Sequence, residues 1–413
     1  MTIWKEYKLG EIADFIDYRG KTPKKTTFGV PLITAKIVKN GTIKEPSEYI
    51  SKEDYPKWMT RGFPKVGDVV LTTEAPLGEV AQIKDASYAL AQRIITLRGK
   101  QNLIENGYLK YFLQSEKGQQ RLKERETGTT VTGIKSSELK QVLISAPDLK
   151  TQTAIAEILS SLDDKIELNN KINQELENLA QTLFKQWFID FEFPNQNGEP
   201  YKSSGGEIVD SELGEIPKGW EVGKYGEFTK TTSGGTPSRK KDEYYINGSI
   251  LWVKSKELNN SMFFDTEEKI NELALKNSSA KLLPPYSVLV AMYGATVGKF
   301  GLITTEAACN QAICAVLPSQ KLPYSFNYLF FQNYRKELEN FAVGSAQQNI
   351  SQEFIKSVKI ALPQNNLLET FHRLVEPFLN AIENNCRENK ELTNLRDTLL
   401  PKLISGELEV KKT

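Results

Sequence analysis

The sequence predicts an α+β protein built from two similar halves, each a mixed α/β domain followed by one long helix. Two observations predict this fold class. Apolar residues between Ile155 and Trp187 recur in steps of three and four, which is the heptad spacing of a helix that packs along another helix. Much of the same pattern returns 216 residues later, as Ile166 and Ile382 show, and segments ahead of it are repeated as well.

The two long helices are each other's best partners, because they carry the same apolar register. The expected seam consists of Ile155, Leu159, Leu162, Ile166, Asn169, Ile172, Leu176, Leu179 and Leu183 with Phe378, Ile382, Asn385, Leu392, Leu395 and Leu399. Asn169 and Asn385 occupy matched places. A buried Asn in such a seam costs stability but fixes register and orientation. The alternative is an Asn that points to water at the edge of the seam.

The repeat extends into the globular parts. A Trp-x3-Lys-x-Gly-Glu segment starts at Trp4 and again at Trp220, and the Gly-Lys-Thr-Pro turn at Gly20 is answered by Gly-Gly-Thr-Pro-Ser at Gly234. The strand-like segments 31–36 and 250–255 then correspond. Residues 66–72 and 285–292 are expected to form buried strands, and residues 108–125 and 325–341 amphipathic helices.

Proline-containing breaks define the domain edges. Pro147 and Pro363 each end a strand-like run before a long helix, since proline cannot supply a ladder N–H. We therefore predict a first domain at 1–150, a long helix at 151–193, a connector at 194–216, a second domain at 217–366 and a second long helix at 367–413.

Composition narrows the class of protein. With 39% apolar and 25% charged residues, the chain should be globular, and it lacks the run of about 18 uncharged apolar residues that a membrane span needs. Its N-terminal segment has no signal-peptide core, so we expect a cytoplasmic protein. Three cysteines and one histidine make a disulfide framework or a zinc site improbable.

Motifs for catalysis within this chain are incomplete. Gly20-Lys-Thr resembles the end of a phosphate-binding loop, but the glycine required upstream is Phe15. Leu283-Pro-Pro-Tyr resembles the Asn/Asp-Pro-Pro-Tyr signature of amino-methyltransferases, whose first residue accepts hydrogen bonds from the target amine. Leu283 cannot accept them. A Ser-His-Asp arrangement would depend on His372, which lies in the second helical pattern. We therefore expect neither catalysis nor a cofactor in this chain.

Recognition of DNA remains the best hypothesis. Basic residues follow each glycine turn, and residues 1–65 hold thirteen Lys or Arg against eight acids. Such loops suit phosphate contacts, whereas amide, guanidinium and carboxylate groups could read bases. The alternative is a solvated charge run. The candidate DNA-binding residues are Lys21, Lys24, Lys25, Lys36, Glu74, Arg93, Thr129, Thr130, Ser238, Arg239, Lys240, Lys241, Lys254, Lys256, Tyr293, Gln347, Gln348 and Asn349.

Five segments carry a resemblance to a known family. They are AEILSSLDDKIELNN at 156–170, LFKQWFIDF at 183–191, LGEIPKGW at 213–220, GGTPS at 234–238 and LLPKLISGE at 399–407. Together with the duplicated layout, they make the chain resemble the specificity (S) subunit of Type I restriction-modification systems along essentially its whole length. The first glycine turn departs from the fuller pattern of the second.

The resemblance implies two target recognition domains, separated by conserved helices that pair as an antiparallel coiled coil. Each domain would read one half of an asymmetric, bipartite site in double-stranded DNA. The helices would set the spacing and dock two modification methyltransferase subunits, while restriction subunits would add translocation and cleavage. S-adenosylmethionine, ATP and Mg would belong to those partners, so this chain would be non-catalytic and need no cofactor of its own.

The length of the first helix suits such a spacer. From Ile155 to Trp187 it spans about 32 residues, or roughly 48 Å, and half-sites one DNA turn apart are separated by about 34–36 Å. Two other classes stay open. One is a scaffold or adaptor that binds proteins without DNA readout, which the net charge of +1 favours. The other is a methyltransferase with its own cofactor site.

Overall fold

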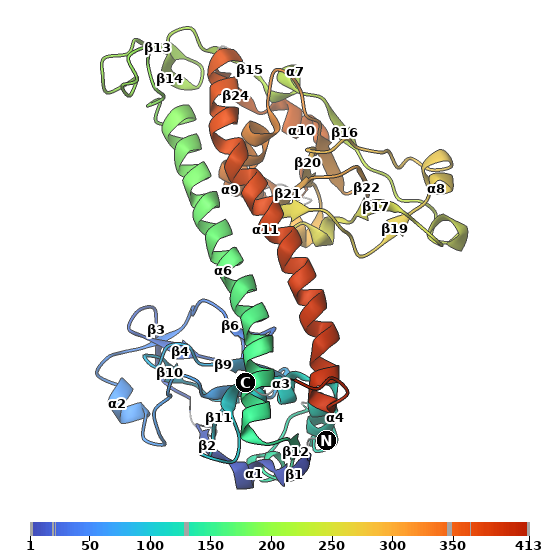
Figure 1. Cartoon of the computed structure of the whole chain (residues 1–413). Coiled ribbons are helices and arrows are strands. Elements are labelled where there is room, and N and C mark those ends of the chain that lie inside the picture. The colour runs from blue at the N-terminus through green and yellow to red at the C-terminus, as the bar shows by residue number, and fades with distance from the viewer. Residues whose placement is uncertain are drawn as a thin grey trace. The chain divides into compact units, whose positions relative to one another are not determined.

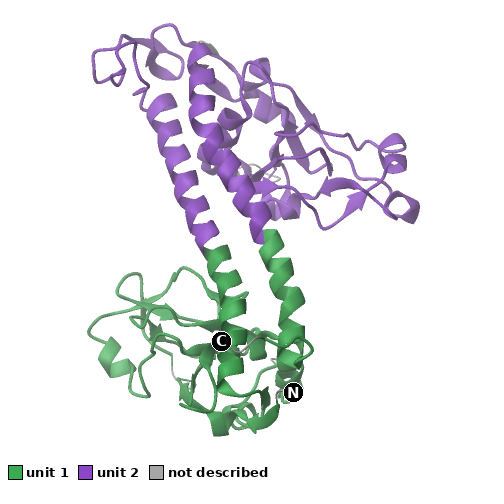
Figure 2. Ribbon diagram, viewed as in Figure 1, with its two compact units in different colours: residues 1–167, 390–413 green, residues 168–389 purple. Residues whose placement is uncertain are grey.

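The computed structural model describes residues 3–18, 20, 22–127, 132–344, 349–363 and 365–410. The chain divides into two compact units, shown in Figure 2: unit 1 contains residues 1–167 and 390–413, and unit 2 contains residues 168–389. Each unit therefore combines one globular part with a stretch of both long helices. Among the described residues, no helix has the length and apolar character needed to cross a membrane.

Unit 1 is a mixed α/β structure (Figure 1). Its elements are β1 (Lys5–Lys8), α1 (Leu9–Ile12), β2 (Ala13–Asp17), β3 (Lys25–Thr26), β4 (Val30–Ile33), β5 (Val38–Lys39), β6 (Thr42–Ile43), β7 (Tyr49–Ile50), α2 (Tyr55–Trp58), β8 (Val69–Thr73), β9 (Leu77–Gln82), β10 (Ala89–Leu90), β11 (Ile94–Gly99), α3 (Asn106–Gln114), α4 (Glu116–Lys123), α5 (Ser136–Leu139), β12 (Leu143–Ala146) and the start of α6 (Leu149–Phe188).

Unit 2 repeats this order with additions. Its elements are β13 (Ile208–Ser211), β14 (Gly214–Pro217), β15 (Glu221–Lys224), α7 (Tyr225–Phe228), β16 (Thr231–Ser233), η1 (Asp242–Tyr244), β17 (Ile250–Val253), η2 (Ser255–Glu257), β18 (Ser261–Phe263), β19 (Lys269–Ile270), α8 (Glu272–Lys276), β20 (Val288–Ala291), η3 (Gly294–Thr296), β21 (Phe300–Ile303), β22 (Ala307–Cys309), β23 (Ile313–Val316), α9 (Tyr324–Gly344), α10 (Gln352–Ser357), β24 (Lys359–Leu362) and α11 (Asn365–Ser405), whose end belongs to unit 1.

The sheets confirm that the two halves share one fold. The sheet β2-β11-β8-β9 of unit 1 corresponds to β16-β23-β20-β21 of unit 2, where β18 adds a fifth strand. A second sheet, β10-β4-β7-β3, corresponds to β22-β17-β19. The pairs β1–β12 and β15–β24 even keep one register, since Lys5 lies opposite Ala146 and Glu221 opposite Leu362.

One alignment within the repeat is wrong by a single residue. The backbone N–H of Ala91 donates to the carbonyl of Ile33 at 3.0 Å, and that of Asn310 donates to Val253 at 3.0 Å. Ile33 therefore corresponds to Val253, whereas the apolar pattern of segments 31–36 and 250–255 matched it with Trp252. Adjacent apolar residues in a short buried strand leave a shift of one undetected, and the hydrogen bonds resolve it.

Several predicted element boundaries also differ, and the second long helix spans Asn365–Ser405 rather than 367–413. The helix expected at 108–125 is two helices, because the extended backbone of Ser115 (ψ 155°) interrupts it and its hydroxyl accepts from the N–H of Gly118 to cap α4. The first long helix stops at Phe188 rather than 193, before Phe191 takes a left-handed backbone with φ 61°. The predicted connector contains the hairpin β13–β14, which turns through Gly214 at φ 88°.

The long helices α6 and α11 pair in antiparallel fashion through a layer of asparagines. Asn169 Nδ2 donates to Asn389 Oδ1 at 2.9 Å and to Glu388, and Asn385 Nδ2 donates to Asn173 Oδ1 at 2.8 Å. The 216-residue repeat matches Asn169 with Asn385 and Asn173 with Asn389. One Asn–Asn pair is therefore the equivalent of the other, and the layer has twofold pseudo-symmetry. Asn169 is fully buried, which excludes the alternative that it points to water.

The seam prediction is wrong for three residues. Ile172, Leu179 and Leu395 are 40%, 45% and 47% exposed. Asn173, Ala180 and Phe184 are buried on α6 instead. A helix with 3.6 residues per turn drifts away from a strict seven-residue repeat, so a heptad extrapolated along α6 leaves the buried face. Of the remaining predicted positions, Ile155, Leu159 and Ile382 are buried, and Leu162, Ile166, Leu176, Leu183, Phe378, Asn385, Leu392 and Leu399 are half-buried.

The two units hold their helices by different chemistry. In unit 1, the Asp163 carboxylate accepts from Lys110 Nζ at 2.8 Å, from the Tyr111 hydroxyl at 2.7 Å and from Arg396 Nη1 at 2.9 Å. In unit 2, the Phe371 ring of α11 packs 4.8 Å from Phe188 of α6 between ring centroids. In unit 1, a charged network thus joins α3 to the two long helices. In unit 2, an aromatic cluster joins the two long helices to each other.

Candidate nucleic-acid interface

In unit 1, several chain segments emerge from one end of the sheet β2-β11-β8-β9. Ile95 of β11 pairs with Asp17 of β2, and Ile94 pairs with Thr72 of β8. The strands are antiparallel, so the turn after β2, the loop after β8 and the residues before β11 lie at the same end. We call this set of segments, Thr22 with residues 74–76 and 91–93, the loop edge of unit 1.

Unit 2 has the same arrangement. Ser233 of β16 pairs with Cys314 of β23, and Ala291 of β20 pairs with Ile313. The loop edge of unit 2 therefore consists of residues 234–237, 292–299 and 310–312. Loops held at the end of a rigid sheet are the usual location of binding residues, because they vary without disturbing the core.

Equivalent backbone hydrogen bonds fasten both loop edges. In unit 1, the N–H of Thr73 donates to Arg93 at 2.9 Å and that of Ile134 donates to Thr73 at 3.0 Å. In unit 2, Met292 donates to Ala312 at 2.8 Å and Ile350 donates to Met292 at 2.9 Å. The segments that follow α4 and α9 therefore return to the loop edges. Asn349 directly precedes Ile350 there, while the candidates Lys21, Thr129, Thr130, Gln347 and Gln348 lie outside the described residues.

A side-chain hydrogen bond shows that the two glycine turns are equivalent. The Thr22 hydroxyl donates to Gln92 Oε1 at 2.9 Å, and the Thr236 hydroxyl donates to Gln311 Oε1 in the same way. The second turn needs its Gly-Gly pair, since a Cβ on Gly235 would lie 2.3 Å from the backbone of Ala280. At Gly20 no atom of the described residues lies within 4 Å of such a Cβ.

The side chains on this common framework differ. Glu74 and Arg93 form an ion pair across the loop edge of unit 1, with 3.0 Å between Oε1 and Nε. At the matched places unit 2 carries Tyr293, which is 41% exposed, and Ala312. The structure thus brings the sequence-predicted candidates Glu74 and Arg93 together. An identical framework with different side chains is what two readers of different sequences require.

The basic residues after the glycine turns are engaged in a repeated ion pair. Lys25 Nζ lies 2.8 Å from Glu48, and Arg239 Nη2 lies 2.7 Å from Glu268. The two carboxylates are equivalent, since Leu32 N–H donates to the carbonyl of Glu48 and Trp252 N–H to that of Glu268. The recurrence of a basic residue at this place is therefore explained by an internal ion pair and does not by itself support a phosphate contact.

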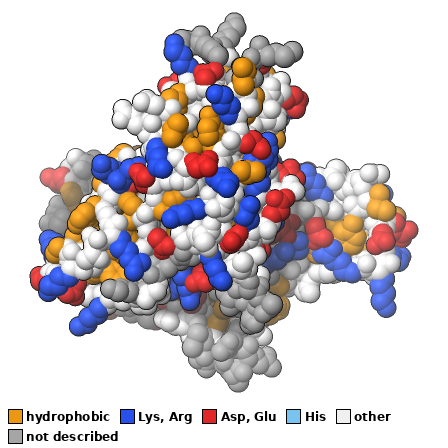
Figure 3. All heavy atoms as spheres, turned by 90° about the horizontal axis from the view of Figure 1, so that it is seen from below, with side chains coloured by type: hydrophobic (Ala, Val, Ile, Leu, Met, Phe, Trp, Pro, Cys, Tyr) orange, Lys and Arg blue, Asp and Glu red, His pale blue; other side chains and the backbone are white. Residues whose placement is uncertain are grey.

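Other basic candidates also have acidic neighbours. Lys36 lies 3.3 Å from Glu48, Lys254 bridges Glu267 and Glu268, Lys256 lies 2.7 Å from Glu267, and Lys241 lies 3.8 Å from Glu243. Within the described part of the chain, Lys24 and Lys240 are exposed and form no ion pair, and the side chain of Ser238 forms no hydrogen bond. Figure 3 shows one face of the molecule, where Lys and Arg lie interspersed with Asp and Glu.

Glu268 should make the stability of unit 2 depend on acidity. Hydrogen bonds from Arg239, and then from Lys254, lower its pKa to about 2. Because the folded pKa lies below the unfolded value of about 4.3, its stabilisation is present above that value and is lost as the pH falls toward 2. We expect Glu268→Gln to lower the free energy of unfolding by under about 1 kcal/mol at pH 7, since the pair is partly exposed. In urea titrations this difference should shrink from pH 5 to pH 3. A constant difference would contradict the assignment.

The single histidine lies in a Ser-His-Glu arrangement that does not form a usable catalytic site. His372 Nδ1 lies 3.0 Å from the Ser325 hydroxyl, and Nε2 lies 3.5 Å from Glu376. Ser325 is fully buried at the start of α9, so no substrate can reach its oxygen. The arrangement links α9 to α11 through packing and hydrogen bonds.

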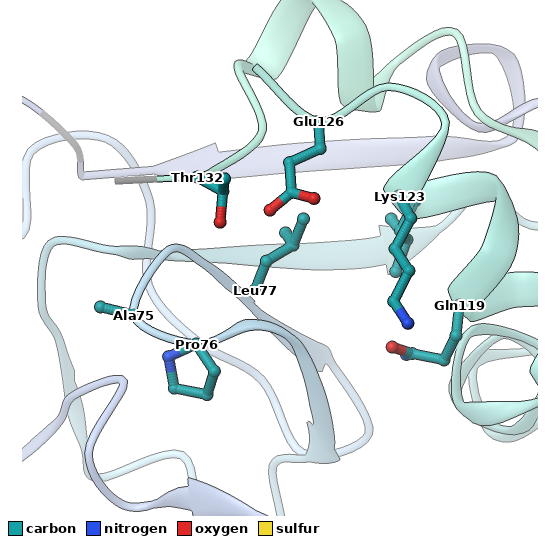
Figure 4. Close-up of a pocket in the computed structure, with 8 residues that line it drawn as sticks. Ala75, Pro76, Leu77, Gln119, Lys123, Glu126 and Thr132 are labelled. Atoms are coloured by element: carbon teal, nitrogen blue, oxygen red, sulfur yellow. The ribbon is translucent and has the colours of Figure 1, made fainter. Parts of the chain in front are cut away.

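A pocket of about 370 Å³ lies beside the loop edge of unit 1 (Figure 4), and the sequence did not predict it. Its lining residues are Ala75, Pro76, Leu77, Gln119, Leu122, Lys123, Glu126 and Thr132. Gly78 has a left-handed backbone with φ 92°, which favours glycine, and a Cβ there would lie 2.6 Å from Gln119 Oε1 of α4. In the sequence, the repeated glycines Gly78 and Gly298 were the only indication of a close approach at this place. Spacing along the chain does not show which helix approaches them.

Comparison with known proteins defines the class. The family model for the Type I restriction modification DNA specificity domain matches residues 1–178 and 217–394, one match for each half. The chain belongs to this family.

Individual relatives agree along the whole length. The chain is 32% identical to the Type I restriction enzyme MjaIX specificity subunit of Methanocaldococcus jannaschii, covering 99% of this chain and 94% of that protein. It is 26% identical to the HindI specificity subunit of Haemophilus influenzae, covering 99% and 100%. The crystal structure of a Type I S subunit from M. genitalium has the same fold, with a TM-score of 0.63, 16% identity and coverage of 100% and 97%.

Proposed function

We propose that this chain is the DNA specificity subunit of a Type I restriction-modification complex, and that each globular part reads one half of an asymmetric, bipartite site. The observation that carries the proposal is the pair of loop edges, which share a framework of hydrogen bonds but present Glu74 and Arg93 in unit 1 and Tyr293 and Ala312 in unit 2. Family membership supports the same role. The scaffold alternative is not favoured, since the family match includes both globular parts.

The remaining parts of the complex follow from this role. Two methyltransferase subunits would dock on the paired helices and supply S-adenosylmethionine, and restriction subunits would supply ATP-driven steps with Mg. The helices α6 and α11 would set the distance between the half-sites, and the asparagine layer would keep their register. In this proposal the chain itself is non-catalytic.

The test is genome-wide detection of N6-methyladenine in cells with and without this chain, in the presence of its active methyltransferase partner. Loss of methylation at one asymmetric two-part motif supports the proposal and identifies the sequence. An unchanged pattern with an active partner contradicts it.

The triple substitution Arg239→Ala, Lys240→Ala and Lys241→Ala should weaken binding to all duplexes and flatten its salt dependence if these residues contact phosphates. The structure refines this prediction, because Arg239 is paired with Glu268 and Lys240 is not paired among the described residues. Lys240→Ala alone should lower the slope of log K against log salt by about 0.9. Fluorescence anisotropy at several salt concentrations between about 50 and 200 mM measures it, because affinity that depends on phosphate contacts falls over this range.

Lys202→Ala is the matched control, since Lys202 is an exposed lysine of the connector. Its slope should equal that of the unaltered chain. Equal slopes for Lys240→Ala and the unaltered chain would remove the phosphate assignment.

A further inference from the structure

Arg93 occupies an unusual backbone position at the loop edge of unit 1. Its φ of 68° is left-handed, although it carries a long side chain, and its carbonyl accepts a hydrogen bond from Thr73. Non-glycine residues in this region cost free energy and cluster at functional sites. Ala312, at the matched place in unit 2, makes the equivalent hydrogen bond with Met292 and is not left-handed. The conformation therefore belongs to unit 1 and is not imposed by the shared framework.

The Arg93 side chain lies against Glu74. Nε of Arg93 lies 3.0 Å from Glu74 Oε1, and the two side chains remain 55% and 40% exposed. Glu74 is itself fixed, because its backbone bridges to Gly133 beside the Thr73–Arg93 hydrogen bond. The Glu74 carboxylate thus lies against the Nε side of the guanidinium group at the rim of the sheet.

The free edge of this guanidinium is suited to one base. Within the described residues, Nη1 and Nη2 of Arg93 have no acceptor, so two parallel donors remain for a ligand. Among the base edges in the DNA major groove, guanine presents two adjacent acceptors, N7 and O6, at the spacing of these donors. The Lys ammonium is a point charge without this planar fork, and a Gln amide presents a donor beside an acceptor oxygen, so neither matches both acceptors with the same rigid geometry.

We propose that Arg93 reads a guanine in the half-site bound by unit 1, and that Glu74 is a positioning residue that holds the guanidinium edge toward the base. The inference rests on the proposed role in DNA specificity. Unit 2, with Ala312 at this place, has no counterpart to this contact. Only one half of the recognised sequence therefore depends on it.

The first test compares methylation motifs in cells that carry the chain with its methyltransferase partner. Arg93→Ala should relax one G·C position in one half-site and leave the other half unchanged. Arg93→Lys, which keeps the charge but loses the fork, should relax the same position. Arg373→Ala is the matched control, because Arg373 is exposed on α11 and pairs with Glu369. A half-site motif that keeps every position in both Arg93 variants overturns the inference but leaves the proposed function intact.

The main comparison of the second test uses the unaltered protein and so does not depend on folding of a variant. Duplexes that carry 7-deazaguanine lack N7 at one position. Replacing the guanine read by Arg93 should weaken binding of the unaltered complex by roughly tenfold to a hundredfold, and should have no effect on the Arg93→Ala complex. A first half-site without guanine on either strand, or equal binding of all 7-deazaguanine duplexes, overturns the inference.

The role of Glu74 is tested by a double-mutant cycle. Glu74→Gln should reduce discrimination at the same G·C position less than Arg93→Ala does, and the double variant should be no worse than Arg93→Ala. If Glu74→Gln instead relaxes a different base pair, Glu74 contacts a base directly and its positioning role is wrong.

Discussion

Replacing Phe371 with alanine should lower the free energy of unfolding of unit 2 by roughly 3–5 kcal/mol. Phe371 is fully buried on α11, and its ring lies 4.8 Å from Phe188 and 5.5 Å from Trp187 of α6 between centroids. Truncation removes the transfer free energy of the ring and leaves a cavity that rigid aromatic neighbours cannot fill. Urea denaturation followed by tryptophan fluorescence measures the change, because Trp187 lies in the cluster.

Leu374→Ala is the matched control on the next turn of α11. Leu374 is 41% exposed, so its truncation should cost under about 1 kcal/mol. A loss for Phe371→Ala no greater than that of the control would show that the aromatic cluster does not hold α6 and α11 together in unit 2.

Replacing Asp163 with alanine should destabilise unit 1 by roughly 3–5 kcal/mol, since it leaves the buried Lys110 ammonium without its counter-ion and beside Arg396. Burial alone would raise the pKa of Asp163, but Lys110 and Arg396 hold the pKa below its ordinary value. Its stabilisation is therefore present above the unfolded pKa of about 3.9 and is lost as the pH falls below it. Urea titrations at pH 7 and at about pH 3, below the unfolded pKa, measure both effects.

Asp164→Ala is the control, because Asp164 is 62% exposed and pairs with Lys84, which is also exposed. It should cost under about 1 kcal/mol. The double variant Asp163→Leu with Lys110→Met should recover most of the loss, since apolar side chains can replace a buried ion pair. Unit 2 already has Leu379 at the place that matches Asp163, and it is buried there. Equal losses in Asp163→Ala and Asp164→Ala would contradict the importance of this network.

The sequence determined the duplicated architecture. A constant offset and a helical period are properties of residue order alone, so they predicted two mixed α/β halves and two paired long helices before any contact was known. Whether Asn169 is buried or points to water stayed open until the structure showed it buried. The loops that carry Glu74, Arg93 and Tyr293 were found in the same way, because they interrupt an otherwise matched framework.

Only the tertiary structure decided which candidate side chains are free to contact a ligand and which are held in internal ion pairs. Glu48 and Glu268 directly precede β7 and β19 and are remote in sequence from Lys25 and Arg239, yet strand pairing brings each carboxylate within 3 Å of its partner. The left-handed backbone of Arg93 and the exposure of Ile172 and Leu179 were likewise decided by the folded structure and not by spacing along the chain. Ion pairing and burial act through space over a few ångströms, and strand register and helix rotation set those distances. Spacing along the chain therefore locates a candidate residue but does not fix its neighbours.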